Sequence, residues 1–217
     1  MWDDHEITND TWRDGAENHQ PDEGDFSERK LAALKAYFEW MPIRPFAAND
    51  ELTIYRQFEF GDLVNLLMLD TRVIGRDQQL DYANYIDPVS GQLDSAGFSA
   101  DLLQPSRTLL GSEQLQWLQD KMSQSDARWQ ILGQQVLMGR MLLPAAIATQ
   151  QLSIAEFSEL ATLAQLAARS QAGDPTLTAE QLAYLQANQA RLTPQVLVLL
   201  QLPAIPYNLD AWDGYPL

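Results

Sequence analysis

The residues that could perform chemistry are concentrated at the start of the sequence. Acidic, amide and imidazole side chains follow one another within a dozen positions: Asp3, Asp4, His5, Glu6, Asn9, Asp10 and Asp14. Carboxylate and amide oxygens suit calcium, magnesium, manganese or ferric iron better than copper or structural zinc. The pattern therefore allows a metal site, and it equally allows a solvated acidic loop in which one aspartate caps a helix.

Known motifs restrict this chemistry further. No window has the ligand spacing of an EF-hand, and the pair His5-Glu6 lacks the second histidine of a zinc-protease helix. The sequence contains neither a P-loop nor the serine elbow of the α/β-hydrolases. It also contains no cysteine, which excludes disulfides, iron–sulfur clusters, cysteine-ligated zinc and a cysteine nucleophile.

Composition indicates one globular, acidic domain. The 217 residues are 46% hydrophobic and 20% charged, which is enough to build a core. The net charge of −16 leaves no basic surface for nucleic acid, and it repels anionic substrates unless cations reverse the local charge. We expect no transmembrane segment, because no apolar run approaches the required length. We also expect no signal peptide, because the first residues are acidic rather than basic and apolar.

The elements that must position the acidic segment begin with a loop and a helix. Residues 1–26 have the composition of a loop, with a disordered acidic tail as the alternative. A helix is predicted from Ser27, as its cap, to Trp40.

Residues 51–75 are predicted to be β structure. Apolar residues alternate with polar ones over 52–60, which predicts a strand with one buried face, and Gly61-Asp62 makes the turn. The nearly continuous apolar run 63–69 predicts a strand covered on both sides. It ends in Asp70-Thr71-Arg72, at the place where open α/β sheets bind ligands. Asp70 and Arg72 could point into a site there, or form a local ion pair that holds the loop.

The second half alternates between irregular and helical segments. Residues 76–111 are predicted to be irregular, followed by a helix from Ser112 and a short strand over 129–133. Capping boxes at Ser153 with Glu156 and at Thr178 with Gln181 start two further helices, so residues 145–190 are predicted to be a helical hairpin inserted in the α/β frame. The aromatic tail 203–217 could close over the site, although plain packing explains it equally well.

Several segments together resemble the PhoD-type alkaline phosphatases. The run Trp2-Asp3-Asp4-His5-Glu6 with Asn9-Asp10-Thr11-Trp12 resembles a diagnostic segment of that family. The later matching segments follow in family order: residues 55–64, 68–72, 110–118, 129–136 and 212–216.

The resemblance implies a fold, an activity and a set of site residues. The implied fold is a calcineurin-like αββα metallophosphoesterase sandwich, here partial. The implied activity is hydrolysis of phosphate mono- and diesters with calcium and iron(III). The implied location is periplasmic or secreted. By this resemblance Asp4 is a metal ligand, Asn9 is a second candidate ligand, and His5 lies beside the scissile phosphate. Arg72, at the end of the buried strand, is then the candidate substrate-binding residue.

The sequence also departs from the family. The family supplies further ligands from a cysteine, a Gly-Asp segment, a tyrosine and a late histidine segment, and none of these is present. We therefore expect residues 1–217 to be the middle portion of a longer phosphatase domain, with open sheet edges and an exposed core face. The alternative function is a catalytically incomplete fragment that acts only as a metal-binding or protein-interaction module.

Overall fold

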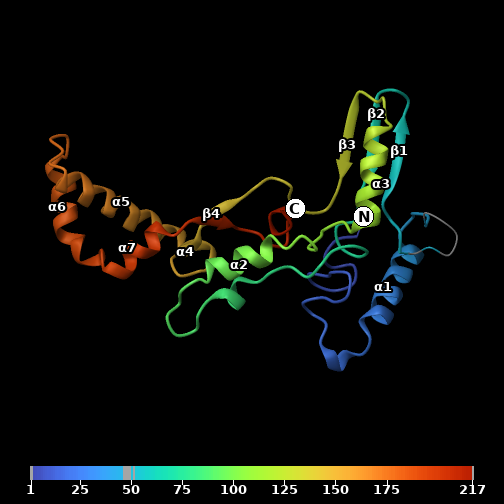
Figure 1. The fold of residues 1–217 in the computed structure, drawn as a ribbon, viewed down its shortest axis with the longest axis horizontal. Coiled ribbons are helices and arrows are strands. Elements are labelled where there is room, and N and C mark those ends of the chain that lie inside the picture. The colour runs from blue at the N-terminus through green and yellow to red at the C-terminus, as the bar shows by residue number, and fades with distance from the viewer. Residues whose placement is uncertain (1, 46–49, 51, 217) are drawn as a thin grey trace. The chain divides into compact units, whose positions relative to one another are not determined.

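The computed structural model describes residues 2–45, 50 and 52–216, and the chain forms two compact units (Figure 1). Unit 1 contains residues 1–81, 96–139 and 209–217, and unit 2 contains residues 82–95 and 140–208. Both units combine helices with a small sheet. The predicted mixed α/β class is therefore confirmed.

Unit 1 is built on a three-stranded sheet. Strand β1 (Arg56–Phe60) runs antiparallel to β2 (Val64–Met68), which pairs in parallel with β3 (Trp129–Gly133). Gly61 makes the β1–β2 turn with a φ of 58°, a left-handed conformation that glycine adopts without a steric penalty. The predicted turn and the predicted strands at 63–69 and 129–133 are confirmed.

Helix α3 (Ser112–Ser123) covers one face of this sheet. Leu67 and Leu69 are fully buried and pack against Leu118 of the helix. The prediction that β2 is covered on both sides is wrong, because Val64, Leu66 and Met68 on its other face are only half-buried.

The predicted buried face of the first strand is also wrong. Phe58 is 44% exposed and Phe60 is 59% exposed. They lie in register with Leu66 and Val64, so they share the half-open face of the sheet. Alternation shows which side chains share a face, but burial depends on an element packing onto that face. Within the described residues, this face remains largely open. Residue 51, at the start of the predicted region, lies outside them.

Helix α1 (Phe26–Trp40) follows a coiled, turn-rich segment that includes the short 3₁₀ helix η1 (Pro21–Glu23). The predicted loop and helix are confirmed, but the cap is Asp25 rather than Ser27. The Asp25 carboxylate accepts hydrogen bonds from the backbone N–H groups of Ser27 and Glu28, at 2.7 and 3.1 Å. An N-cap must precede the first helical residue, and Ser27 is already inside the helix.

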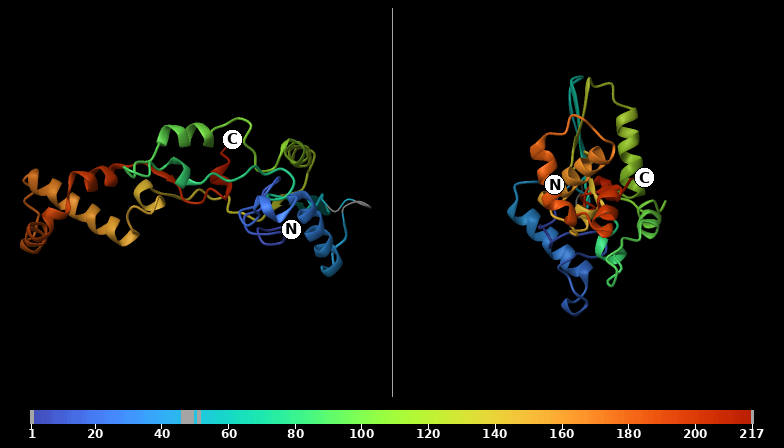
Figure 2. Two further views of the ribbon diagram at one scale, coloured as in Figure 1. Left: turned by 90° about the horizontal axis from the view of Figure 1, so that it is seen from below. Right: turned by 90° about the vertical axis from the view of Figure 1, so that its left-hand side faces the viewer.

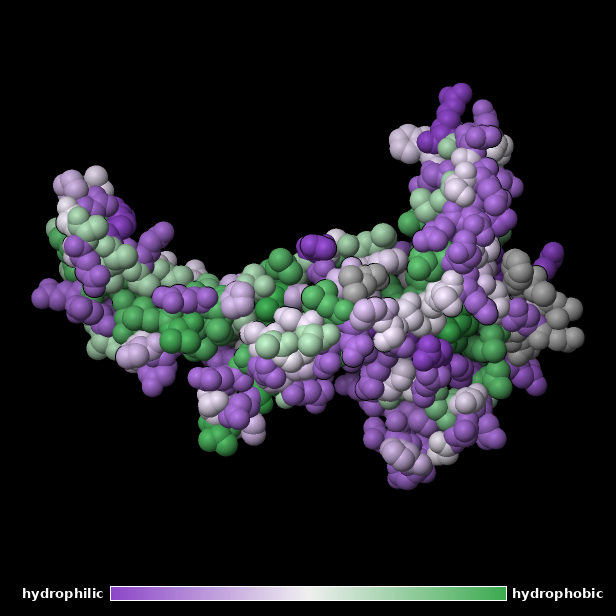
Figure 3. Space-filling view, viewed as in Figure 1, coloured by the Kyte–Doolittle hydropathy of each residue, from purple (hydrophilic) through white to green (hydrophobic). Residues whose placement is uncertain are grey.

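Unit 2 is largely helical. A two-stranded ribbon, β4 (Leu142–Pro144) with β5 (Ala204–Pro206), brackets four helices. These are α4 (Ala145–Ala148), α5 (Ile154–Gln171), α6 (Ala179–Asn188) and α7 (Pro194–Gln201), with a 3₁₀ turn η3 (Gln189–Arg191) before the last. Helix α5 contacts both α6 and α7, and the three helices lie together in the orange and red part of the ribbon (Figures 1 and 2). Apolar residues gather on the surface over α5 and α7 (Figure 3).

The local signals in unit 2 are confirmed. Ser153 and Thr178 form the two predicted capping boxes. The helical region continues through α7, beyond the predicted 145–190.

The prediction that residues 76–111 are irregular is wrong in part, because η2 (Tyr82–Tyr85) and α2 (Ser95–Leu102) form there. The remaining short element is the 3₁₀ turn η4 (Trp212–Gly214). In the described part of the chain, no helix is long and apolar enough to cross a membrane.

Candidate functional site

The acidic, amide and imidazole side chains singled out in the sequence lie within residues 2–19, which we call the N-terminal segment. It coils beside α1 (Figure 2). Trp2 is fully buried against Leu34 of α1, Ile54 and Val73. This burial rules out the alternative of a disordered tail, because the segment is part of the core of unit 1.

Backbone hydrogen bonds fix the other end of the N-terminal segment. Arg13 N–H donates to the Arg76 carbonyl at 2.9 Å, and Trp12 N–H donates to the Gly15 carbonyl at 2.8 Å. A Cβ at Gly15 would lie 2.6 Å from the Trp12 ring, so this tight turn requires glycine. The segment is therefore anchored at both ends on unit 1, with the polar residues between the anchors.

Asp4 and His5 lie together at the start of the N-terminal segment. The His5 Nε2 atom is 3.4 Å from Asp4 Oδ2, and the side chains are 76% and 28% exposed, respectively. Glu6 closes the turn by accepting a hydrogen bond from the Asp3 N–H at 2.5 Å. The Asp4 carboxylate is partly shielded from solvent, while the His5 imidazole is exposed and could contact a substrate.

Asn9 is oriented by Glu17. The Asn9 Nδ2 donates to Glu17 Oε2, and the Glu17 N–H donates back to the Asn9 carbonyl at 3.1 Å. The amide nitrogen is used by this bond, so Oδ1 is the Asn9 atom that could bind a cation. Support of this kind from a neighbouring carboxylate orients a metal ligand before the ion arrives.

Asp10 follows Asn9 with a φ of 46°, a left-handed conformation that few non-glycine residues adopt. Its carboxylate Oδ1 is 3.9 Å from Arg72 Nη1. Burial raises the pKa of Asp10, and the negative charge of Asp210 raises it further, whereas the charge of Arg72 lowers it.

The end of β2 is organised by Asp70. The fully buried carboxylate accepts hydrogen bonds from the backbone N–H groups of Arg72 and Val73, both at 2.9 Å. The Gln114 side chain bonds both the N–H and the carbonyl of Asp70, each at 2.7 Å. Burial raises the pKa of Asp70 to about 6. Its Oδ2 is buried without a hydrogen-bond partner among the described residues.

Arg72, the predicted substrate-binding residue, lies in the interior of unit 1, and its contact with a substrate stays a prediction. The side chain is 4% exposed, and its guanidinium forms a two-bond ion pair with Asp210, at 2.7 and 2.5 Å. A substrate phosphate would have to displace that carboxylate in the interior. The alternative of an ion pair that holds the loop describes the residue better, although its partner is Asp210 and not Asp70.

The tail takes part in packing. Tyr215 is buried with Leu109 and Val136, and its hydroxyl donates to the Asp77 carbonyl at 2.6 Å. The Trp212 indole donates to Gln134 Oε1 at 3.1 Å. These contacts confirm the packing alternative for the aromatic tail.

The type of ligand atom favours binding of a hard metal ion, but the number of ligands close together does not. Asp4 and Asn9 offer the hard oxygen atoms that calcium and ferric iron prefer. Among residues 2–45, 50 and 52–216, however, no three His, Asp or Glu side chains lie close enough together to hold an ion. The N-terminal segment can therefore supply part of a ligand set.

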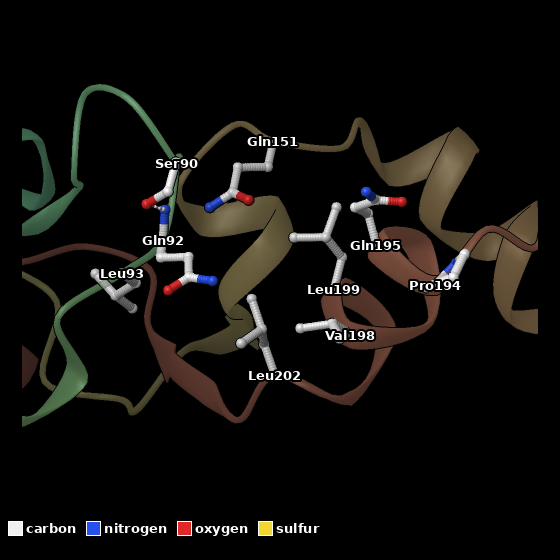
Figure 4. Close-up of a pocket in the computed structure, with 9 residues that line it drawn as sticks. All are labelled: Ser90, Gln92, Leu93, Gln151, Pro194, Gln195, Val198, Leu199 and Leu202. Atoms are coloured by element: carbon white, nitrogen blue, oxygen red, sulfur yellow. Dashed lines mark hydrogen bonds between the residues drawn. The ribbon is translucent and has the colours of Figure 1, made fainter.

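Unit 2 contains a separate groove of about 580 Å³ between the loop 90–93 and α7 (Figure 4). It is lined by Ser90, Gln92, Leu93, Gln151, Pro194, Gln195, Val198, Leu199 and Leu202. None of these described residues is titratable, so the groove offers no acid, base or charged metal ligand. The chemistry-bearing residues are on the N-terminal segment.

Sequence reasoning missed the residues that support the site. Glu17, Arg76 and Asp210 were not candidates, although each bonds a candidate or its neighbour. Arg72 and Asp210 are 138 positions apart. No local sequence pattern identifies such a pair, and the net charge does not show which charged residues are buried.

Comparisons with known proteins agree with one another. The sequence model of the family described as PhoD-like phosphatase matches residues 1–217. Alkaline phosphatase D of Bacillus subtilis (strain 168) is 36% identical over 141 residues, which are 64% of this chain and 22% of that protein. A solved structure described as the structure of PhoD aligns with 100% of this chain and 29% of that one, with a TM-score of 0.55 and 25% identity. The chain thus spans about a quarter of the length of these relatives.

Proposed function

The chain belongs to the PhoD-like phosphatase family, and from this premise we propose that it contributes part of the active site of a metal-dependent phosphoesterase. The substrates are phosphate mono- and diesters, and the cations are calcium and iron(III). The observation that carries the proposal is the pairing of Asp4 with the exposed His5 on a segment anchored at both ends.

The proposed roles follow from the chemistry of ester hydrolysis. A bound cation supplies neutralising charge at the phosphate oxygens and a water that ionises near neutral pH. Asp4 and the Oδ1 of Asn9 would bind the cation, and Glu17 orients the Asn9 amide through a hydrogen bond. The imidazole of His5 donates a proton to the leaving oxygen, because it is both exposed and adjacent to the ligand Asp4.

The charge of the chain is compatible with this role. A protein of net charge −16 repels a phosphate ester at long range. Cations held by the acidic N-terminal segment reverse the sign of the local field, so the substrate meets positive charge only at the site. Metal loading is therefore expected to control substrate binding as well as turnover.

A second candidate function is a non-catalytic module that binds metal or another protein. One observation favours it: the sheet of unit 1 exposes a row of large apolar side chains. Phe58, Phe60, Trp129 and Ile131 are all more than 40% exposed on the same face. Exposed apolar faces of this kind mark contacts with other protein surfaces.

The experiment that separates the two candidates measures hydrolysis of p-nitrophenyl phosphate and bis-p-nitrophenyl phosphate by the purified chain. Assays run from neutral to mildly alkaline pH, with and without calcium and iron(III), together with metal analysis. We expect metal-dependent turnover that is weak, because the N-terminal segment supplies only part of a ligand set, and that His5→Ala reduces to background. His19→Ala is the matched control, because His19 bonds Gly24 and Arg29 away from Asp4. Absence of both turnover and bound metal would contradict the enzyme proposal and favour the module.

The place of action is proposed on the same family basis. We propose a periplasmic or secreted location, where phosphate esters from outside the cell are available. Fractionation of cells that produce the natural protein, with an antibody to this chain, tests the location directly. Recovery only in the cytoplasmic fraction would contradict it.

A further inference from the structure

Two buried arginines and one partly exposed aspartate form a cluster in unit 1, which we call the charged core: Arg72, Arg76 and Asp210. The side chains of Arg72 and Arg76 are 4% and 0% exposed. Both guanidinium groups bond the Asp210 carboxylate, and Arg76 Nη2 also donates to the Asp210 carbonyl at 2.7 Å. One carboxylate cannot neutralise two guanidinium groups, so the charged core carries an excess positive charge.

The N-terminal segment supplies the balancing charge. Asp10 is the second carboxylate within 4 Å of Arg72, at 3.9 Å. A buried positive charge is costly without a partner, so the charged core favours any conformation that keeps Asp10 close. The attraction acts on the backbone as well, because Asp10 is held in a left-handed conformation that is otherwise disfavoured.

The position of Asp10 determines what this attraction can do. Asp10 is the direct neighbour of Asn9, whose amide is fixed on its other side by Glu17. Asn9 is therefore fixed by Glu17 and, through the adjacent backbone, by Arg72. Because Asn9 and Asp10 share a peptide bond, a shift of Asp10 would be transmitted to the backbone of Asn9, and cation ligands tolerate distance errors of only a few tenths of an ångström.

We propose that Arg72 is a positioning residue of the candidate cation site, and that it acts through Asp10 to hold Asn9 and the adjoining loop in their ligating arrangement. This proposal rests on the proposed function only in the assumption that the N-terminal segment binds a cation. The ordering of the N-terminal segment by Arg72 stands on the geometry alone. Arg72 thus has a role at the site that requires no contact with substrate.

The chain offers variants that separate positioning from general stability. Arg72→Gln removes the excess charge but leaves Asp210 paired with Arg76, so we expect the fold to survive. Arg72→Lys keeps the charge and loses the paired geometry. Arg107→Lys is the matched control, because Arg107 donates to the Gly214 carbonyl at 2.8 Å and stacks on Tyr215, which are contacts with the tail.

The first measurement is amide hydrogen exchange across the full 217-residue chain. We expect Arg72→Gln and Asp10→Asn to speed exchange of residues 5–13 by roughly tenfold, because each leaves one partner of a partly buried pair unmatched. Arg72→Lys restores part of the protection. Arg107→Lys speeds exchange in residues 209–216 and leaves residues 5–13 unchanged. The double variant Arg72→Gln/Asp10→Asn exchanges like either single variant, since both act through one contact.

The second measurement is a titration with terbium(III), a hard luminescent cation, sensitised by the tryptophans of unit 1. The same variants are expected to weaken binding by roughly tenfold, the usual size of an effect from residues that support a ligand. Additive effects of Arg72→Gln and Asp10→Asn, or unchanged exchange at residues 5–13, would overturn the positioning role. If the unsubstituted chain binds no terbium, the metal function fails, while the exchange result still decides whether Arg72 orders the segment.

Discussion

Ion pairs in the two units differ in depth and in reach along the chain. In unit 1, Arg72 and Asp210 meet in the interior across 138 residues. In unit 2, Arg169 pairs with Asp174 five residues away, and Arg191 pairs with Glu159 on the surface. Buried pairs are costly to break, whereas surface pairs are screened by water and contribute little. Unit 1 therefore contains a long-range pair with a buried arginine that is costly to break, whereas the ion pairs described in unit 2 are more exposed.

The two units can be followed separately. All six tryptophans belong to unit 1: Trp2, Trp12, Trp40, Trp117, Trp129 and Trp212. Tryptophan fluorescence therefore reports on unit 1 alone. Far-UV circular dichroism reports mostly on the helices, many of which are in unit 2. Each prediction below uses the signal of the unit that carries the substitution.

The largest effect is expected from Asp210→Ala, which leaves two buried guanidinium groups without their shared partner. Breaking a buried pair in this way costs about 3–5 kcal/mol, so the fluorescence transition in urea should move strongly to lower denaturant. Glu159→Ala is the comparison in unit 2, where the lost pair with Arg191 is at the surface and the shift is measured in the circular dichroism transition. Equal shifts for the two variants would remove the distinction between buried and surface pairs.

The next effect is expected from Leu163→Ala in α5. Leu163 is completely buried, and its truncation should cost about 3 kcal/mol through lost packing and a residual cavity. The loss should appear in the circular dichroism transition and not in the fluorescence transition. A parallel shift of the tryptophan signal would show that the units unfold together.

A smaller effect concerns pH. Burial raises the pKa of Asp70 to about 6, so the folded chain binds this proton more tightly than the unfolded chain does. The stability gained by protonation is fully present below the unfolded pKa of about 4 and is lost as the pH rises through about 6. Between these limits we expect unit 1 to gain on the order of 3 kcal/mol on acidification, relative to Asp70→Asn.

The pH comparison uses the difference between the two proteins, because other carboxylates titrate in the same range. The Asp70→Asn variant keeps the shape of the side chain and cannot titrate. Fluorescence-detected urea transitions of both proteins, repeated along the pH range, give the difference. Parallel stability curves for the two proteins would contradict a raised pKa at Asp70.

The smallest effect is expected at a helix cap. Ser153→Ala removes the side chain that accepts from the Glu156 N–H at 3.2 Å, at a cost of about 1 kcal/mol to α5. Ser158→Ala, on the exposed face of the same helix, should leave the circular dichroism transition nearly unchanged. If both serines give the same shift, the capping box does not stabilise α5.

The same contrast explains what could be predicted from the sequence. Elements encoded by neighbouring residues were predicted well, such as the capped helices at Ser153 and Thr178. The strand at 56–60 was located, but its burial was not, because Phe58 and Phe60 are covered only if something packs on them. The family resemblance predicts that the N-terminal segment is the place of chemistry, and this stays a prediction.

No sequence pattern predicts the charged core. Arg72 looked like a ligand-binding residue because it follows a buried strand, and nothing near it in sequence indicated Asp210. Such pairs form when the chain folds back on itself, and a single sequence does not record which distant residues meet. The supporting role of Glu17 beside Asn9 is of the same kind, although eight residues separate them.

The central claim is that the N-terminal segment binds a hard cation through Asp4. The direct measurement is isothermal titration of calcium into the metal-free chain, with Asp4→Asn and Asp3→Asn compared side by side. Asp3 is the matched control, because it is an adjacent, exposed aspartate. We predict that Asp4→Asn weakens calcium binding by roughly tenfold or more and that Asp3→Asn has little effect. Equal affinities for the two variants, or no calcium binding by the unsubstituted chain, would contradict the claim.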